Sequence, residues 1–124
     1  MSREIKFRAW INGGEDHNYV MTYYLAFEEY APINKLLNGL KEGEALMQYT
    51  GLQDLDGGNI YEGDIIQFNF RDKRGDVRTF LGKVIWDQYM WLVETKDGDQ
   101  FSLNRIHHPI IFGTIHEDLN LLKQ

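Results

Sequence analysis

Short runs of β-branched and aromatic residues, separated by compact turn signals, dominate the chain after residue 63. DIIQFNF begins at Asp64, TFLGKVIWD at Thr79, YMWLVET at Tyr89, QFSL at Gln100 and IIFGTI at Ile110. The stretches RDKRGD and KDGD lie between neighbouring runs and favour tight turns. Short strands at this spacing, with little helix between them, predict a small antiparallel barrel or sandwich. The apolar tail DLNLL is expected to make a last helical turn.

The first 43 residues combine a predicted hairpin with one short helix. In EIKFRAWI, residues 4–11, apolar and polar residues alternate with the period of a strand that has one buried face. NGG at 12–14 ends this run, and YVMTYYLAF, which ends at Phe27, is the expected partner strand. Pro32 suits the first turn of a helix, and apolar residues continue at helical spacing before Gly43: Ile33, Leu36, Leu37 and Leu40. The chain is therefore expected to be mainly β, with helix in the minority.

Composition predicts one folded domain kept in a reducing compartment. The 124 residues are 43% hydrophobic and 14% aromatic, which is enough material for a core. Because the chain has no cysteine, disulfides, thiolate zinc sites and a cysteine nucleophile are excluded together. No apolar run is long enough for a signal peptide or a membrane span, so we expect a cytoplasmic protein without membrane contact.

Charge argues against general binding of nucleic acid. Thirteen Lys and Arg against nineteen Asp and Glu give a net charge of -6, so the average field repels polyanions. A nucleic-acid site would need a local patch, and the candidate cations lie in one predicted hairpin: Arg71, Lys73, Arg74, Arg78 and Lys83. Because Asp72 and Asp76 are interleaved with them, a solvated hairpin is the favoured interpretation.

The stretch LMQYTGLQDLDGGNIYEGDII, residues 46–66, holds two turn signals and the start of a strand. TGLQDLDGG followed by IYEGDII, together with REIKFRAW near the start of the chain, closely resembles the YopX family of small phage and prophage proteins. The resemblance implies an SH3-like barrel in residues 44–124 of a single domain, with residues 1–43 as its variable part. It implies no reaction, because the family has no established activity. The motif residues are expected to be structural: Thr50, Gly51, Leu52, Asp54, Gly57, Tyr61, Gly63 and Asp64.

Asp54, Asp56 and Gly57 resemble part of a calcium loop, in which alternate carboxylates reach one ion. The register does not fit, because Leu52 would then occupy the first ligand position and Gly63 the twelfth. An Asp/Gly turn with positive backbone angles at glycine is the favoured interpretation.

Glu62 and Asp64 flank a glycine at the predicted strand entry. They would form an acid/base pair of a small hydrolase if burial raised the pKa of one carboxyl. A structural role explains the same residues without chemistry, because an aspartate beside a glycine bend accepts hydrogen bonds from backbone amides.

The histidines and serines lack the spacing of a known site. The pair HH at 107–108 would point to opposite faces of an extended segment before Pro109 and could not share a metal. His116 and Glu117 add no metalloprotease spacing, and neither Ser2 nor Ser102 lies in a nucleophile elbow. No metal, cofactor or covalent catalysis is expected.

Four aromatic residues crowd one predicted hairpin: Trp86, Tyr89, Trp91 and Phe101. Such residues usually belong to the core of a small barrel, but exposed ones offer a stacking platform to bases or an apolar surface to a protein. We expect one or two of the four to be exposed and to mark an interface.

The favoured hypothesis is a phage or prophage accessory protein, in the cytoplasm of the bacterial host, that binds another macromolecule without catalysis. The partner would be an unidentified protein or a second copy of the chain. The alternatives are a nucleic-acid-binding module using the 71–83 hairpin and a small hydrolase using Glu62, Asp64 and the histidines. A contiguous basic face would favour the first alternative, and a pocket uniting carboxylates and histidines the second. Nucleic-acid binding is expected to be weak.

Overall fold

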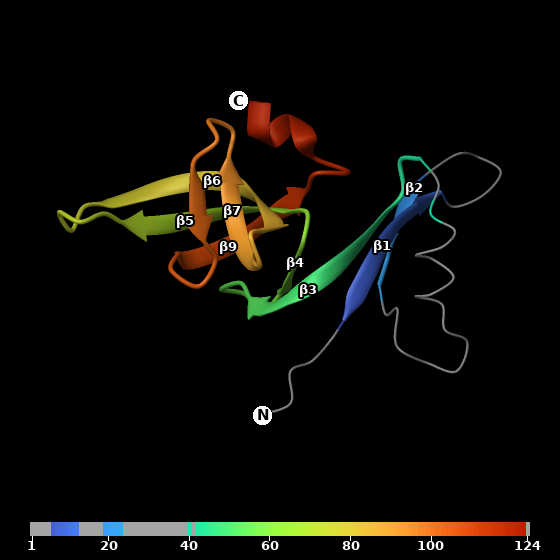
Figure 1. The fold of residues 1–124 in the computed structure, drawn as a ribbon, viewed down its shortest axis with the longest axis horizontal. Helices are drawn as coiled ribbons and strands as arrows, with labels where there is room; N and C mark the ends of the chain where they lie inside the picture. Colours follow the sequence, from blue (N-terminus) through green and yellow to red (C-terminus); the bar gives the residue numbers. More distant parts are fainter. Residues whose placement is uncertain (1–5, 13–18, 24–39, 41, 124) are drawn as a thin grey trace. The chain divides into compact units, whose positions relative to one another are not determined.

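The computed structural model describes residues 6–12, 19–23, 40 and 42–123, and Figure 1 shows their strands and turns. The elements, in chain order, are β1 (Phe7–Asn12), β2 (Tyr19–Thr22), β3 (Ala45–Gln53), β4 (Asn59–Tyr61), β5 (Asp64–Arg71), β6 (Val77–Asp87), β7 (Met90–Thr95), β8 (Gln100–Ser102), β9 (His107–Thr114) and the 3₁₀ helix η1 (Leu119–Lys123). The fold is thus mainly β, and the strand pairs with assigned registers are antiparallel. The chain divides into two units, residues 1–49 and 50–124.

In residues 1–49, β1 pairs with β2 on one side and with β3 on the other. Trp10 on β1 stacks on Tyr19 on β2, with ring centroids 5.8 Å apart. Arg8 and Ala9 are 2% and 0% exposed, so the predicted single buried face of this strand is wrong at Arg8. The guanidinium carbon of Arg8 lies 5.9 Å from the ring centroid of Tyr23, a cation–π contact that helps to offset its burial.

In residues 50–124, five strands form a curled antiparallel sheet in the order β8-β7-β6-β5-β9. Two strands separate β8 from β5 in this order, yet the ring centroids of Phe101 on β8 and Phe70 on β5 are 4.8 Å apart. The sheet therefore curls into a half-barrel (Figure 1), as the strand spacing predicts. It closes over a buried apolar cluster: Ile60, Ile66, Phe68, Val84, Val93, Leu103 and Ile106.

The predicted strands are confirmed for β1, β2 and β5 to β9, and so is the hairpin between β1 and β2. Of the run predicted to end at Phe27, residues 19–22 form β2, and residues 24–27 lie outside the described residues. Two further strands, β3 and β4, lie in the stretch that the sequence assigns to turns. β3 continues to Gln53, so only residues 54–58 of TGLQDLDGG form a turn. The predicted final helical turn is η1, whereas the helix predicted from Pro32 lies outside the described residues. In the described ranges, no helix has the length and apolar character needed to cross a membrane.

Candidate functional site

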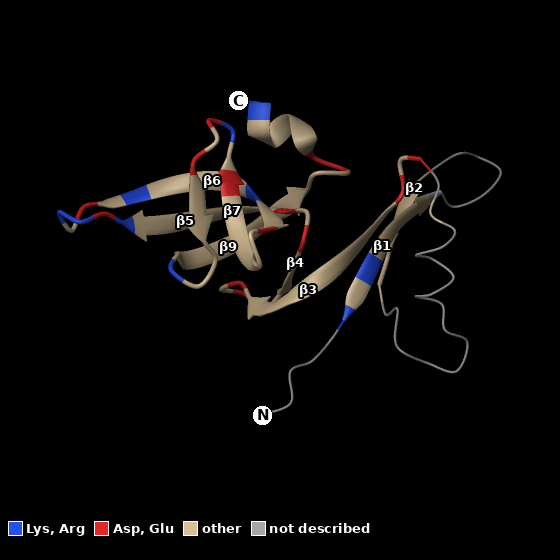
Figure 2. Cartoon of the chain, viewed as in Figure 1, with Lys and Arg blue, Asp and Glu red and all other residues tan. Residues whose placement is uncertain are grey.

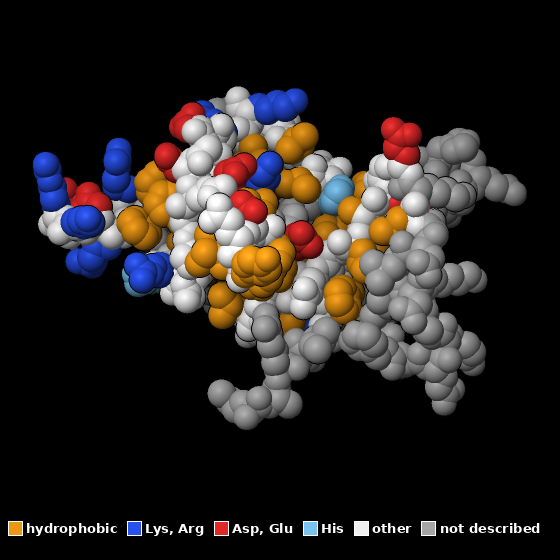
Figure 3. Space-filling view, in the orientation of Figure 1, with side chains coloured by type: hydrophobic (Ala, Val, Ile, Leu, Met, Phe, Trp, Pro, Cys, Tyr) orange, Lys and Arg blue, Asp and Glu red, His pale blue; other side chains and the backbone are white. Residues whose placement is uncertain are grey.

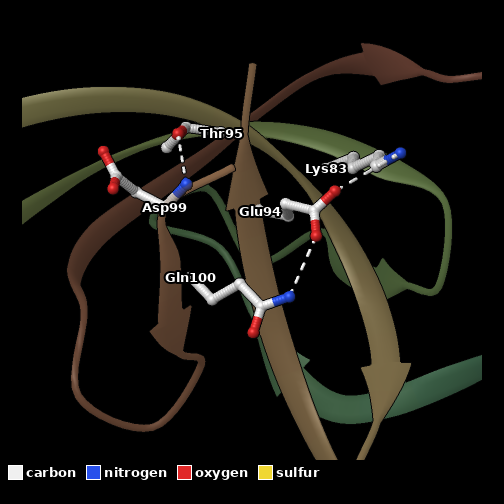
Figure 4. Close-up of polar contacts among 5 residues, drawn as sticks. All are labelled: Lys83, Glu94, Thr95, Asp99 and Gln100. Carbon is white, nitrogen blue, oxygen red and sulfur yellow. Dashed lines mark hydrogen bonds and ion pairs between the residues drawn. The ribbon is translucent and has the colours of Figure 1, made fainter. Parts of the chain in front are cut away.

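Three turns in residues 50–124 share one design. They span residues 54–58, 72–76 and 95–99, and in each the backbone N–H of the fifth residue donates to a side-chain oxygen of the first, at 2.8, 2.9 and 3.2 Å. Figure 4 shows the third of these bonds, between Thr95 and Asp99. The fourth residue is a glycine, with φ of 85°, 87° and 87°: Gly57, Gly75 and Gly98. Backbone geometry accounts for the Asp/Gly pattern of the family motif.

Asp54 differs from Asp72 and Thr95, the first residues of the other two turns, because its second carboxylate oxygen accepts a hydrogen bond from outside its own turn. Oδ1 accepts hydrogen bonds from the backbone N–H groups of Asp56 and Gly58, at 3.0 and 2.8 Å. Oδ2 accepts one from the backbone N–H of Ile111 on β9, at 3.1 Å. One carboxylate therefore fastens the β3–β4 turn to a strand 57 residues away along the chain.

Residues 61–64 form the tight turn from β4 into β5. Gly63 has a φ of 88°, the positive angle that a type II turn requires at its third position. The side chain of Asp64 is 1% exposed, and its Oδ2 accepts a hydrogen bond from the Tyr61 backbone N–H at 2.7 Å. Nearby, the Thr50 hydroxyl donates to the Ile60 carbonyl at 2.7 Å. These contacts give IYEGDII, residues 60–66 of the motif, a structural role in the turn and the two strands that it joins.

The hydrolase alternative requires a cavity that unites carboxylates with histidines. Two hollows in residues 50–124, with volumes of ≈ 190 and ≈ 410 Å³, are lined by neither Glu62 nor Asp64, and by no histidine. Among the residues that the structure describes, no group of three or more His, Asp or Glu side chains is placed to hold a metal ion.

His107 and His108 lie at the start of β9. His108 has a φ of 53°, so the pair does not form the regular extended segment assumed from the sequence. Register shifts occur in the β5–β9 pairing between Gln67 and Asn69, and Asn69 Nδ2 is 3.3 Å from His108 Nδ1. The irregular pairing explains the unusual backbone angle.

Four of the five candidate cations gather at the end of the β5–β6 hairpin, in a group that we call the basic tip (residues 71–78; Figures 2 and 3). All four are exposed: Arg71, Lys73, Arg74 and Arg78. Arg71 lies opposite Val77 and Arg78 opposite Phe70, so the two arginines leave opposite faces of the hairpin. The tip is therefore a rounded basic end and not a flat basic face.

Lys83 does not belong to the basic tip. It lies further along β6, opposite Ile65, and its Nζ is 3.7 Å from Oε1 of Glu94 on β7. The other oxygen of Glu94 accepts a hydrogen bond from Gln100 Nε2 at 2.9 Å (Figure 4). Lys83 is thus part of a cross-strand polar cluster on β6, β7 and β8.

The β6–β7 hairpin carries an exposed aromatic turn, which we define as residues 86–91. Trp86 and Trp91 are cross-strand partners with ring centroids 4.9 Å apart, and the two-residue loop between the strands is Gln88-Tyr89. Their φ angles of 52° and 64° make it a type I′ turn. Trp86, Tyr89 and Met90 are 51%, 93% and 41% exposed. The expectation of one or two exposed aromatic residues is confirmed, because Trp91 and Phe101 are half-buried.

The larger of the two hollows lies beside this turn and is called the aromatic hollow below. Its volume is ≈ 410 Å³ and its lining is Phe70, Met90, Gln100, Phe101, Ser102, Asn104 and Arg105. Met90 also belongs to the aromatic turn, and Phe70 is the cross-strand partner of Arg78 in the basic tip. No sequence signal predicted this hollow, because its lining comes from β5, β7, β8 and the segment after β8.

Comparison with known proteins gives a family and a fold. A family model described as YopX protein matches residues 6–123. The crystal structure of protein EF1440 from Enterococcus faecalis is similar, with a TM-score of 0.55 and 20% sequence identity over 98% of this chain and 99% of that chain. At this identity the likeness shows a shared fold alone. No curated protein matches the chain.

Proposed function

The chain belongs to the YopX family, and from this premise we propose that it is a phage or prophage accessory protein that binds a protein partner through the aromatic turn and performs no catalysis. A second copy of the chain is one such partner. We also propose the cytoplasm of the bacterial host as its location, which the absence of cysteine supports.

One observation carries the proposal: Tyr89 is 93% exposed at the centre of a backbone turn that its residue type disfavours. Type I′ turns strongly prefer Asn-Gly, because both central residues need positive φ, and Gln88-Tyr89 satisfies neither preference. Holding two ordinary side chains there costs about 1 kcal/mol or more. Backbone strain of this kind concentrates at binding and active sites. Its use here would be to present Tyr89, Trp86 and Met90 together.

Amino-acid type supports a protein as the ligand of this turn. Tyrosine and tryptophan are enriched among the residues that dominate protein interfaces, because they combine a large apolar area with a polar group. The acid/base pair of the hydrolase alternative, Glu62 and Asp64, offers less to a catalytic proposal, since Asp64 accepts a backbone hydrogen bond in the turn that it closes.

The direct test is affinity capture from induced or infected host cells with tagged wild-type protein and the Tyr89→Ser variant. We expect the variant to lose the captured protein without a fall in melting temperature. If the partner is a second copy of the chain, we expect the variant to be monomeric in analytical ultracentrifugation under conditions in which the wild type associates. Phe112→Ser is the matched control, because Phe112 on β9 is also an exposed aromatic residue, 49% exposed, outside the aromatic turn. Equal capture by all three proteins would refute the assignment of this surface.

The double variant Gln88→Asn/Tyr89→Gly separates strain from binding. It places the preferred residues at both positive φ angles, so we expect about 1–2 kcal/mol more stability and a melting temperature about 5 °C higher. Partner binding should fall at the same time, because the exposed ring is removed. A lower melting temperature would contradict the assignment of the turn.

A further inference from the structure

The aromatic hollow combines apolar rings with a cation and no anion. Phe70 and Phe101 contribute rings whose centroids are 4.8 Å apart, and Arg105 contributes an exposed guanidinium. The remaining polar lining consists of Gln100, Ser102 and Asn104, so no carboxylate faces the space. A volume of ≈ 410 Å³ falls within the range of small-ligand sites.

The two rings are held firmly. Phe101 also lies 5.3 Å from Phe68 and 4.8 Å from Phe80, measured between ring centroids. Phe68 is 1% exposed and belongs to the buried cluster of the half-barrel. The lining rings therefore rest on core rings, and a flat group entering the hollow would meet a rigid surface.

The net charge of the basic tip has the opposite sign to the net charge of the rest of residues 50–124. Residues 71–78 hold four cations and two carboxylates, a net charge of +2, whereas the rest of residues 50–124 holds four cations and ten carboxylates, a net charge of -6. Arg78 lies opposite Phe70 in the β5–β6 register, so it leaves the same face of the hairpin as that lining ring. Arg105 therefore lines the hollow itself, and Arg78 projects from the face of the hairpin that carries the lining residue Phe70.

Asp72 and Asp76 lower the net charge of the basic tip but, among the described residues, do not hold its cations in ion pairs. Asp72 uses Oδ1 to accept hydrogen bonds from the backbone N–H groups of Arg74 and Asp76, both at 2.9 Å. Within the described part of the chain, no cation of the basic tip forms an ion pair with either carboxylate. The positive side chains of the basic tip can therefore contact the phosphates of a bound anion.

We propose that the aromatic hollow and the basic tip bind a short segment of single-stranded nucleic acid, a ligand distinct from the protein partner proposed for the aromatic turn. Unpaired bases stack over Phe70 and Phe101, and backbone phosphates contact Arg105 and the cations of the basic tip on the same face, Arg78 first among them. Aromatic platforms combined with cations are the general means of binding single strands, whose base faces are free. A duplex hides those faces, and a polyanion without bases has none.

The net charge of -6 limits how strongly the chain is expected to bind nucleic acid. The few phosphate contacts must overcome the repulsion of the whole chain, so binding should be measurable at low salt and nearly lost at physiological salt.

The experiment measures the anisotropy of fluorescent oligo(dT) and oligo(U) at low salt, with a duplex of equal length and inorganic polyphosphate as competitors. We expect the single strands to bind more tightly than the duplex, and polyphosphate at equal phosphate concentration to compete poorly. Phe70→Leu should weaken binding about fivefold or more, because it keeps apolar bulk but removes a stacking face. The melting temperature of Phe70→Leu is measured as well, so that a loss of binding is separated from a loss of folding.

Arg78→Gln and Arg105→Gln test the cations without altering the core, since both side chains are exposed. Each should lower the slope of log affinity against log salt by about 0.7, the value for one phosphate contact of a single strand. Lys123→Gln in η1 is the control with the same loss of charge, and its slope should match that of the wild type. Equal binding of duplex, polyphosphate and single strands would reduce the surface to a general anion patch and overturn the proposal, as would equal slopes for all three variants or no binding at all.

Discussion

Replacing Gly63 with valine is expected to lower the melting temperature by about 10 °C, because this residue combines a positive φ with burial. A side chain at this angle costs about 1–2 kcal/mol, and forcing a branched one into a packed site costs about 1–3 kcal/mol more. The Gly63 backbone also joins β6 to the residue that follows β9: its N–H donates to the Val84 carbonyl, and its carbonyl accepts from the Ile115 N–H, both at 2.9 Å. Relaxing the strain would break these bonds.

Gly75→Val is the control, because it separates the backbone angle from the burial. Gly75 has nearly the same φ, 87° against 88°, but a Cβ atom added there meets nothing within 4 Å. We expect about half the loss of melting temperature, from the angle alone. Thermal unfolding followed by circular dichroism measures both variants. If Gly63→Val has the same melting temperature as the wild type, the tight turn before Asp64 is wrongly described.

Strands with alternating or continuous β-branched residues could be predicted from local pattern alone. β5 and β6 each carry such a run, and RDKRGD between them contains the acceptor and glycine that its turn uses. β3 could not be found in the same way, because Gly51, with φ of 90°, lies inside the strand but belongs to a residue type that favours turns. Pairing with β4 outweighs that local preference.

At the aromatic turn, in contrast, the structure has a turn where the sequence contains no turn signal. Gln88-Tyr89 contains no turn residue, so the sequence predicts two strands there without a reason for the chain to reverse. The reversal is fixed by the pairing of β6 with β7, which aligns Trp86 with Trp91 and leaves two residues for the loop. Tertiary pairing imposes positive φ on residues that do not favour it. A conflict between local preference and the fold is itself a signal of function.

The basic tip could be predicted only in part. Spacing along the chain groups Lys83 with the four arginines and lysines before it, because a sequence does not show which cation meets a carboxylate on a neighbouring strand. The register of β6 with β7 places Lys83 directly opposite Glu94, and removes it from the group. Arg105 joins the same end of the sheet through the lining of the aromatic hollow, although 27 residues separate it from Arg78.

Removing the Asp54 carboxylate should be the other large loss of stability. Asp54→Ala leaves three backbone N–H groups without their acceptor, two within the turn and one on β9. Hydrogen bonds to a charged group contribute about 1.5–3 kcal/mol each when buried, and less here because the site is half-exposed. We expect a total loss of about 3 kcal/mol and a fall of about 10 °C in melting temperature. Denaturant unfolding followed by tryptophan fluorescence measures the free energy directly.

Asp72→Ala supplies the matched comparison, because Asp72 makes the same two bonds within its turn but none to another strand in the described part of the chain. Its loss should be about 1 kcal/mol, the usual contribution of local capping bonds. Asp54→Asn should fall between the two variants, since the amide oxygen can keep the turn bonds while its NH₂ group faces the Ile111 N–H, donor against donor. Equal losses for Asp54→Ala and Asp72→Ala would show that the bond to β9 contributes nothing, and that the family motif serves the turn alone.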